Sequence, residues 1–292
     1  MSGKRRVHHP NDVTNRYFSE VIPGILHNYF RLPGKFIRNY TTKIIRRDGT
    51  EGEMDWLILV ELDNYRLFRR ILINVEFQSS CVTEEKIEII SDYKDYAKIY
   101  YGLPVLTVII ITDGYESSVK EYSSVPSDIL KPIYIHIPWE EITERLKSLE
   151  EKIDNHSTLD EDDGLDMVYL PMFSPRDKAE EILDRIIQLF MIDESLKGPF
   201  KEHVVFGLNI MVKKYFGPTS KSEELLEMLE KTVDNDRLRM VAEFELDFER
   251  QLFERKLADK DAELSERDAE ISQKDAEIDA LKAKLEENGI AY

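Results

Sequence analysis

Residues 54–78 read MDWLILVELDNYRLFRRILINVEFQ, a segment with two β-strand patterns around a short polar turn. Residues 54–62 and 70–78 are rich in β-forming side chains, and Asp63-Asn64 offers the turn between them. Two adjacent strands with a short connection favour an antiparallel hairpin. The midpoint between Asp55 and Glu76 is position 65.5, close to that turn. The pattern therefore predicts that both carboxylates share one face of the hairpin, opposite each other or one diagonal step apart.

The second strand pattern carries polar side chains where a core strand is normally apolar. Side chains alternate between the faces of a strand, so Asn74, Glu76 and Gln78 share a face. An unpaired carboxylate in a low-dielectric interior is costly, and a bound cation would remove that cost. Mg²⁺ takes few protein oxygens and keeps several waters, so Asp55 and Glu76 together suit it. We therefore expect a metal centre at this end of the hairpin.

The flanking segments predict an α/β sandwich. Helical spacing of apolar residues occurs at residues 11–30, where Pro23 should bend or split the helix, and again at residues 84–101. Short β patterns occupy residues 42–47 and 133–137. The unbroken apolar run at residues 105–112 is typical of a strand that is covered on both faces.

The C-terminal half differs in charge and in pattern. Residues 1–140 carry 18 Lys/Arg against 19 Asp/Glu, whereas residues 141–292 carry 22 against 39. We expect an acidic linker at residues 141–175, a helical region at 176–250 and a weak coiled-coil tail at 251–292. The tail has a heptad seam with one large apolar residue in most repeats, although a solvated charged helix fits the same pattern. The seam consists of Leu257, Leu264, Ile271, Ile278 and Leu285.

Composition narrows the class of protein. A single cysteine, Cys81, excludes a disulfide framework and points to a reducing cytoplasm. No apolar run approaches the roughly 20 residues that a membrane span needs, so we expect no membrane partner. The net charge of -18 disfavours nucleic acid, yet the first 47 residues hold 10 Lys/Arg against Asp12 and Glu20 alone. The charge of the N-terminal half is therefore compatible with binding to the phosphate backbone of a nucleic acid.

Further motifs accompany the hairpin. An Asp-basic-Glu-Pro pattern precedes it, an Asp-Tyr pair follows it on the next predicted helix, and an apolar Val/Ile run comes after that. The residues are Asp12, Arg16, Glu20 and Pro23, then Glu76-Phe77-Gln78, Asp92-Tyr93 and residues 108–111. In this order they resemble the PD-(D/E)XK nucleases, most closely the Rpn/YhgA-like recombination-promoting nuclease and transposase family, over residues 8–140.

The resemblance implies a fold, a reaction and a set of site residues. Residues 1–140 would form a PD-(D/E)XK nuclease-like core, a mixed sheet flanked by helices, followed by the helical region and the heptad helix. Asp55 and Glu76 would hold Mg²⁺ or Mn²⁺, Gln78 would stand where other relatives carry Lys, and Glu20 would be an additional first-helix acid. The expected function is metal-dependent DNA endonuclease activity linked to recombination or transposition, with self-association through the C-terminal helices.

Three other interpretations stay open at this stage. Gln78 in place of Lys, and Ile89 where the family usually has Arg, permit a catalytically inactive module for DNA binding or oligomerisation. Asp55 and Glu76 could be structural carboxylates paired with Arg46 or Arg70. A coiled-coil assembly protein would explain residues 251–292 alone.

The tyrosines and lysines of residues 93–100 could form a nucleic-acid face, although packing of most tyrosines on the sheet with solvated lysines is the simpler expectation.

Overall fold

The computed structural model describes residues 10–45, 51–63, 69–113, 121–125 and 128–233, together with Lys274. The chain divides into two compact units, residues 1–239 and 240–292, and every element described below belongs to the first unit. The coiled-coil tail predicted at residues 251–292 lies outside the described residues apart from Lys274, as does the end of the predicted helical region.

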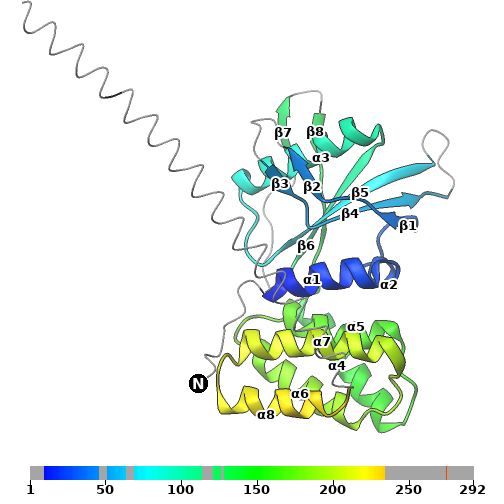
Figure 1. The fold of residues 1–292 in the computed structure, drawn as a ribbon, viewed down its shortest axis with the longest axis vertical. Helices are drawn as coiled ribbons and strands as arrows, with labels where there is room; N and C mark the ends of the chain where they lie inside the picture. The colour runs from blue at the N-terminus through cyan, green and yellow to red at the C-terminus, as the bar shows by residue number, and fades with distance from the viewer. Residues whose placement is uncertain are drawn as a thin grey trace, which may run out of the picture. The chain divides into compact units, whose positions relative to one another are not determined.

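A five-stranded mixed sheet is the centre of this unit (Figure 1). Its order is β1-β4-β5-β6-β9, with antiparallel pairing from β1 to β5 and parallel pairing from β5 to β9. The strands are β1 (Lys35–Asn39), β4 (Trp56–Glu61), β5 (Arg70–Gln78), β6 (Val105–Ile111) and β9 (Ile133–Ile135). Two further pairs are β2 (Lys43–Ile45) with β3 (Glu51–Glu53) and β7 (Tyr122–Val125) with β8 (Asp128–Leu130). The predicted hairpin and the mixed α/β sheet flanked by helices are confirmed.

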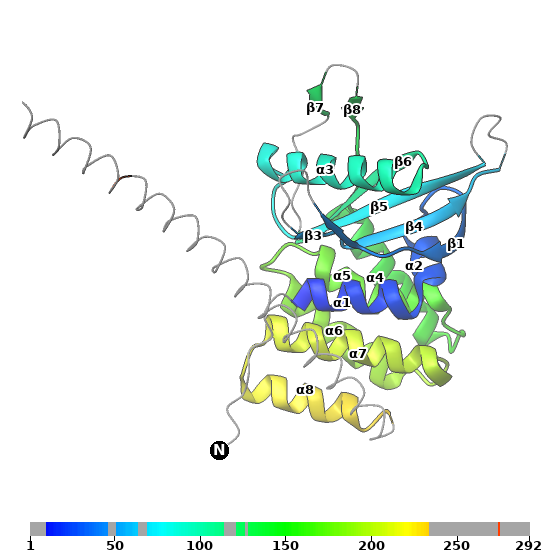
Figure 2. The same ribbon diagram turned by 45° about the horizontal axis from the view of Figure 1, so that its top comes forward.

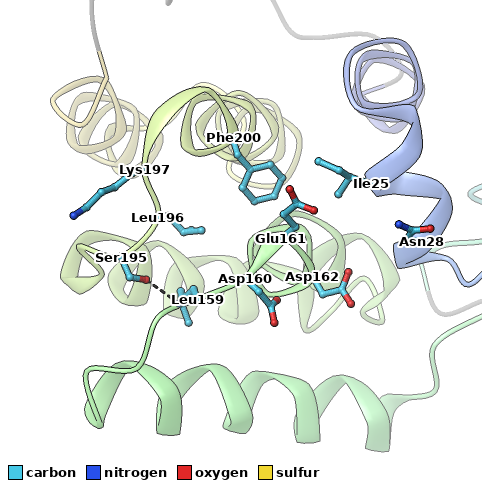
Figure 3. A pocket seen from close by; sticks show the side chains of 10 residues that line it. All are labelled: Ile25, Asn28, Leu159, Asp160, Glu161, Asp162, Ser195, Leu196, Lys197 and Phe200. Atoms are coloured by element: carbon cyan, nitrogen blue, oxygen red, sulfur yellow. Dashed lines mark hydrogen bonds between the residues drawn. The ribbon is translucent and has the colours of Figure 1, made fainter.

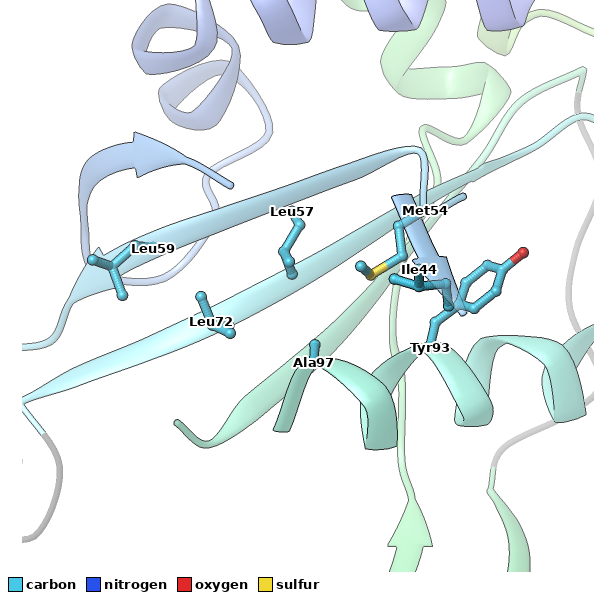
Figure 4. Close-up of a cluster of buried hydrophobic side chains, with 7 residues drawn as sticks. All are labelled: Ile44, Met54, Leu57, Leu59, Leu72, Tyr93 and Ala97. Atoms are coloured by element: carbon cyan, nitrogen blue, oxygen red, sulfur yellow. The ribbon is translucent and has the colours of Figure 1, made fainter. Parts of the chain in front are cut away.

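Helix α3 (Glu84–Tyr101) covers one face of the sheet. The Thr83 hydroxyl caps its first turn by accepting a hydrogen bond from the Lys86 backbone N–H, and Gly102 ends it in the left-handed conformation. Apolar side chains fill the space between this helix and β4–β5 (Figure 4). They are Ile44, Met54, Leu57, Leu59, Leu72, Tyr93 and Ala97, called the α3 cluster below.

Helices α1 (Pro10–Val21) and α2 (Pro23–Tyr29) lie on the opposite side of the sheet from α3 (Figure 2). Pro23 occupies the first turn of α2, so the predicted split at this proline is confirmed. The Phe30 ring contacts Phe77 of β5 at 5.9 Å and Tyr169 at 5.2 Å between centroids. These aromatic contacts join the sheet to the helices beyond α1 and α2.

The remaining helices form a layer against α1 and α2. They are α4 (Trp139–Asp154), α5 (Glu161–Phe173), α6 (Ala179–Ile192), α7 (Gly198–Tyr215) and α8 (Ser220–Glu230). The Tyr29 hydroxyl donates to the Asp166 carboxylate of α5 at 2.9 Å. Gly198-Pro199 begins α7, and Gly217-Pro218 follows its end. None of the described helices is long and apolar enough to cross a membrane.

The prediction of an acidic linker at residues 141–175 is wrong, because these residues form most of α4 and all of α5. Asp160 begins α5 with a capping box to Asp163, and the acidic residues of the first turn suit the positive end of the helix dipole. From Asp163 onward every residue of α5 is buried. The acidic run therefore starts a core helix. The sequence analysis also missed β1, the edge strand beside β4.

Gly34 fixes the entry into β1, and its replacement should destabilise the fold. Its φ is +80°, and a Cβ at this position would lie 2.8 Å from the Glu61 carbonyl oxygen. We expect Gly34→Ala to lower the free energy of unfolding by about 2 kcal/mol or more, measured by urea denaturation. Gly102→Ala is the control, because its φ is +66° and nothing lies within 4 Å; it should cost about 1 kcal/mol. Equal losses in the two variants would contradict the clash.

Candidate metal centre

The hairpin brings Asp55 and Glu76 together. Trp56 pairs with Val75, so one further step in the same register sets Asp55 opposite Glu76. The Phe77 backbone N–H donates to Oδ2 of Asp55 at 2.8 Å, which holds the carboxylate beside the end of β5. The predicted convergence of these two side chains on one face of the hairpin is therefore observed.

Glu76 is a buried carboxylate without full hydrogen bonding. Its exposed fraction is 1%, and within the described part of the chain its Oε1 atom has no hydrogen-bond partner. Its Oε2 atom lies 3.9 Å from Nζ of Lys86 on α3. Burial, and then the charge of Asp55, raises the pKa of the Glu76 carboxyl well above its usual value, although Lys86 acts in the opposite direction. One ammonium at this distance leaves the carboxylate incompletely compensated.

Two more polar side chains are buried on the same face as Glu76. Asn74 precedes it by two residues, and Thr107 is the register partner of Asn74 on β6. Asn74 lies close enough to Glu76 to lower the pKa of the carboxyl, yet neither amide atom meets the geometry of a hydrogen bond. The Thr107 hydroxyl also has no hydrogen-bond partner among the described residues. Buried polar groups are normally paired, so three such groups in a row indicate missing partners such as water or an ion.

This donor set fits a small divalent cation. Asp55 is exposed, so an ion can reach it from solvent, while Glu76 lies behind it in the protein interior. Mg²⁺ needs few protein ligands because it keeps much of its water shell. A richer ligand set, with three or more His, Cys, Asp or Glu side chains together, does not occur within the described ranges. The residues present therefore fit Mg²⁺ or Mn²⁺ better than a metal that requires four protein ligands.

Gln78 and Glu20 occupy different places relative to this pair. Gln78 ends β5 on the same face as Glu76, and its backbone carbonyl accepts from Thr112 N–H at 2.8 Å. Glu20 lies on α1, across the sheet from α3, and is 51% exposed. Its ion pair is with Arg16 at 3.0 Å, and Arg16 in turn lies 3.7 Å from Glu53. The structure thus sets Asp55 opposite Glu76 and Gln78 one alternation further along β5, while Glu20 lies on α1 and is linked through Arg16 to Glu53, two residues before Asp55.

Lys86 is the residue near this centre that the sequence analysis missed. The interpretation of Glu76 as a structural carboxylate expected Arg46 or Arg70 as its partner; Arg46 lies outside the described residues, and Arg70 pairs in register with Glu61. The sequence contained a signal for this contact, because residues 79–83 leave room only for a short connection. A helix after so short a connection must run back over the strand that it follows. The first turn of α3 therefore lies over the end of β5, where Glu76 is.

A surface pocket of about 540 Å³ lies elsewhere, in the helical layer (Figure 3). The start of α5 lines it together with α2 and the connection from α6 to α7. Asp160, Glu161 and Asp162 give it an acidic lining, and Asp160 is already engaged as the cap of α5. An acidic lining repels phosphate, so this pocket does not suit a nucleic-acid substrate.

In comparisons with known proteins, no protein family, no curated protein and no solved structure matches this chain.

Glu76 should make the metal-free protein less stable as the pH rises. Because its pKa is higher in the folded state, the folded protein binds the proton more tightly than the unfolded chain does. Stability is therefore lost from the usual pKa of 4.5 upward, until the pH passes the folded-state pKa. We expect Glu76→Gln to gain melting temperature relative to wild type between about pH 5 and pH 8 in EDTA.

The matched control is Glu85→Gln, which changes an exposed carboxyl in the first turn of α3. Its melting temperature should follow that of wild type across the same pH range. Parallel profiles for Glu76→Gln and wild type would contradict the burial of an ionisable group at this position.

Proposed function

We propose that this protein is a metal-dependent DNA endonuclease whose centre consists of Asp55, Glu76 and Gln78. The observation that carries the proposal is the buried Glu76 carboxylate, which lies beside an exposed second carboxylate and has one oxygen without a hydrogen-bond partner among the residues that the structure describes. In a structural ion pair we would expect a cationic side chain in close contact with the Glu76 carboxylate. The Lys86 ammonium instead lies 3.9 Å from one carboxylate oxygen.

Each residue has a defined task in this proposal. Asp55 and Glu76 provide the two carboxylate oxygens that would hold Mg²⁺ or Mn²⁺. Such an ion, when bound, polarises a phosphodiester and lowers the pKa of a bound water. Gln78 follows Glu76 by one alternation of the strand, so its amide can orient the attacking water by a hydrogen bond. The neutral Gln78 side chain supplies no positive charge to the centre. Lys86 supplies one, since its ammonium lies beside Glu76.

DNA as the substrate rests on the resemblance to the PD-(D/E)XK nucleases and on the charge of the N-terminal half. The described part preserves the order of elements that this resemblance requires: helix, antiparallel hairpin, helix and parallel strand. The resemblance also motivates the proposed link to recombination or transposition. Self-association through residues 251–292 remains part of the proposal, since it would give the nuclease two centres for two strands.

A catalytically inactive DNA-binding module is the second candidate, and Gln78 favours it because a neutral amide replaces the lysine of other relatives. Ile89 argues less strongly for it. This residue packs against the α3 cluster, so its apolar side chain has a structural reason that is independent of activity. The two candidates differ in whether phosphodiester cleavage occurs.

Nicking of supercoiled plasmid DNA with Mg²⁺ or Mn²⁺ tests the proposed activity. We expect Asp55→Ala and Glu76→Ala to lower the nicking rate by roughly 100-fold or more, because each removes a charge that stabilises the transition state. Asp162→Ala is the matched control, since it removes an exposed carboxylate from the acidic pocket of the helical layer. Wild-type protein that fails to nick DNA with either metal would favour the inactive module.

A further inference from the structure

Four tyrosines form a continuous chain of ring contacts between the end of α3 and the end of β1. Tyr96 stacks on Tyr100 with 5.5 Å between ring centroids, Tyr100 contacts Tyr101 edge-on at 4.8 Å, and Tyr101 contacts Tyr40 at 4.5 Å. The Arg38 guanidinium lies over the Tyr40 ring, 4.7 Å from its centroid, and donates to the Tyr40 hydroxyl at 2.8 Å. These five residues are called the tyrosine surface below.

Packing of α3 does not account for the outer part of this surface. Tyr93 is buried in the α3 cluster, as the simpler expectation for this helix predicted. The expectation of solvated lysines is wrong at Lys94, which is buried and lies 3.6 Å from the Asp95 carboxylate. Tyr100, in contrast, is 66% exposed, and its neighbour Ile99 is 82% exposed. Large apolar side chains at such exposure mark a surface that binds something, particularly when several aromatic rings adjoin.

The chain segment that carries Arg38 and Tyr40 of the tyrosine surface is basic. Residues 31–47 contain six Lys or Arg and no Asp or Glu, although the whole chain has a net charge of -18. Of these, Arg31, Lys35, Arg38 and Lys43 are exposed in the structure. β1 is an edge strand, so its cations lie along the border of the sheet. A polyanion therefore meets favourable charge at this border in an otherwise acidic protein.

The tyrosine surface is connected to the metal centre through β4. The Tyr40 backbone N–H donates to the Leu57 carbonyl at 2.8 Å, and Leu57 follows Asp55 by two residues. Tyr40, Tyr96 and Tyr101 also pack against the α3 cluster, which contains Met54 and Leu57 (Figure 4).

Lys86 lies beside Glu76 and Tyr100 is 14 residues further along α3, so roughly 21 Å of helix separates the exposed ring from the candidate metal centre. A DNA strand that binds both places must therefore extend over several nucleotides.

We propose that the tyrosine surface binds the unpaired bases of single-stranded DNA. The exposed Tyr100 ring can stack on a base only when a face of that base is free, and in a duplex both faces are covered by stacking on the neighbouring base pairs. The Arg38 guanidinium and its basic neighbours suit the backbone phosphates of the same strand. The inference rests on the proposed function in one respect: it names unpaired DNA as the substrate class of the Asp55–Glu76 centre.

Fluorescence anisotropy of a labelled oligo(dT) strand of about 15 nucleotides tests this inference on the full chain. The titration is done in EDTA, so that no metal-dependent cleavage contributes, and is repeated with the same strand annealed to oligo(dA). We expect wild type to prefer the single strand and Tyr100→Ala to weaken binding by roughly tenfold. Tyr100→Phe, which keeps the ring, should bind within about twofold of wild type.

Ile99→Ala is the matched control, because it removes a neighbouring apolar side chain that is even more exposed and has no ring. It should leave the affinity within about twofold of wild type. Preference for the duplex, absence of strand binding, or equal losses in Ile99→Ala and Tyr100→Ala would each overturn the inference. A protein that binds the single strand but, with Mg²⁺ or Mn²⁺, cleaves neither that strand nor supercoiled plasmid would contradict the proposed nuclease while supporting the tyrosine surface, so the two failures are distinguishable.

Discussion

The antiparallel register of β4 and β5 is the constraint on which the candidate metal centre depends. In this register Trp56 pairs with Val75 and Glu61 pairs with Arg70, and the same alignment sets Asp55 opposite Glu76. A slip by one residue would turn Glu76 to the other face of the sheet, where Phe30 and Phe77 pack. The apolar side chains of β4 and β5 therefore fix the position of the carboxylates, because they fit the two sides of the sheet in only one alignment.

The two faces of the sheet differ in the side chains that they bury. On the side of α1 and α2, aromatic rings such as Phe30, Phe77 and Tyr169 join the sheet to the helical layer, and burial of apolar area stabilises this contact. On the α3 side the cluster is apolar around Leu57 and Leu72 but becomes polar toward Glu76. A protein that needed only stability would have continued the apolar cluster. The buried Glu76 carboxylate therefore lowers the stability of the fold, and the proposed function gives a reason for its presence.

Much of the fold could be predicted because it depends on local pattern. The hairpin, the α3 helix, the split at Pro23 and the apolar strand β6 each carry a periodicity or a turn signal in their own residues. β1 was missed because KFIRN is a short edge strand with mostly exposed side chains, and it has little apolar alternation. The prediction of a linker at residues 141–175 is wrong because acidic residues favour the first turn of a helix as well as a linker, and those at 160–163 begin α5.

The candidate site was predictable where strand alternation determines it and unpredictable where tertiary packing does. Asp55, Glu76 and Gln78 follow from the hairpin geometry alone. The contact of Lys86 with Glu76 depends on how α3 lies over β5, and the side of the sheet on which Glu20 lies depends on the packing of α1. Neither arrangement leaves a local sequence pattern. The tyrosine surface likewise joins residues about 60 positions apart, Tyr40 and Tyr101, through the pairing of β1 with β4.

Direct measurement of Mn²⁺ binding tests the central claim, that Asp55 and Glu76 form a cation site. Free Mn²⁺ gives an electron paramagnetic resonance signal that is lost on binding, so the signal measures the free ion during a titration. The titration is done in about 0.15 M salt, because salt weakens loose binding of Mn²⁺ to surface carboxylates. The account predicts one bound Mn²⁺ per chain in wild type and an affinity lower by roughly 10- to 100-fold in Glu76→Gln. The same stoichiometry and affinity in wild type and Glu76→Gln would contradict it, because the buried carboxylate would then hold no metal.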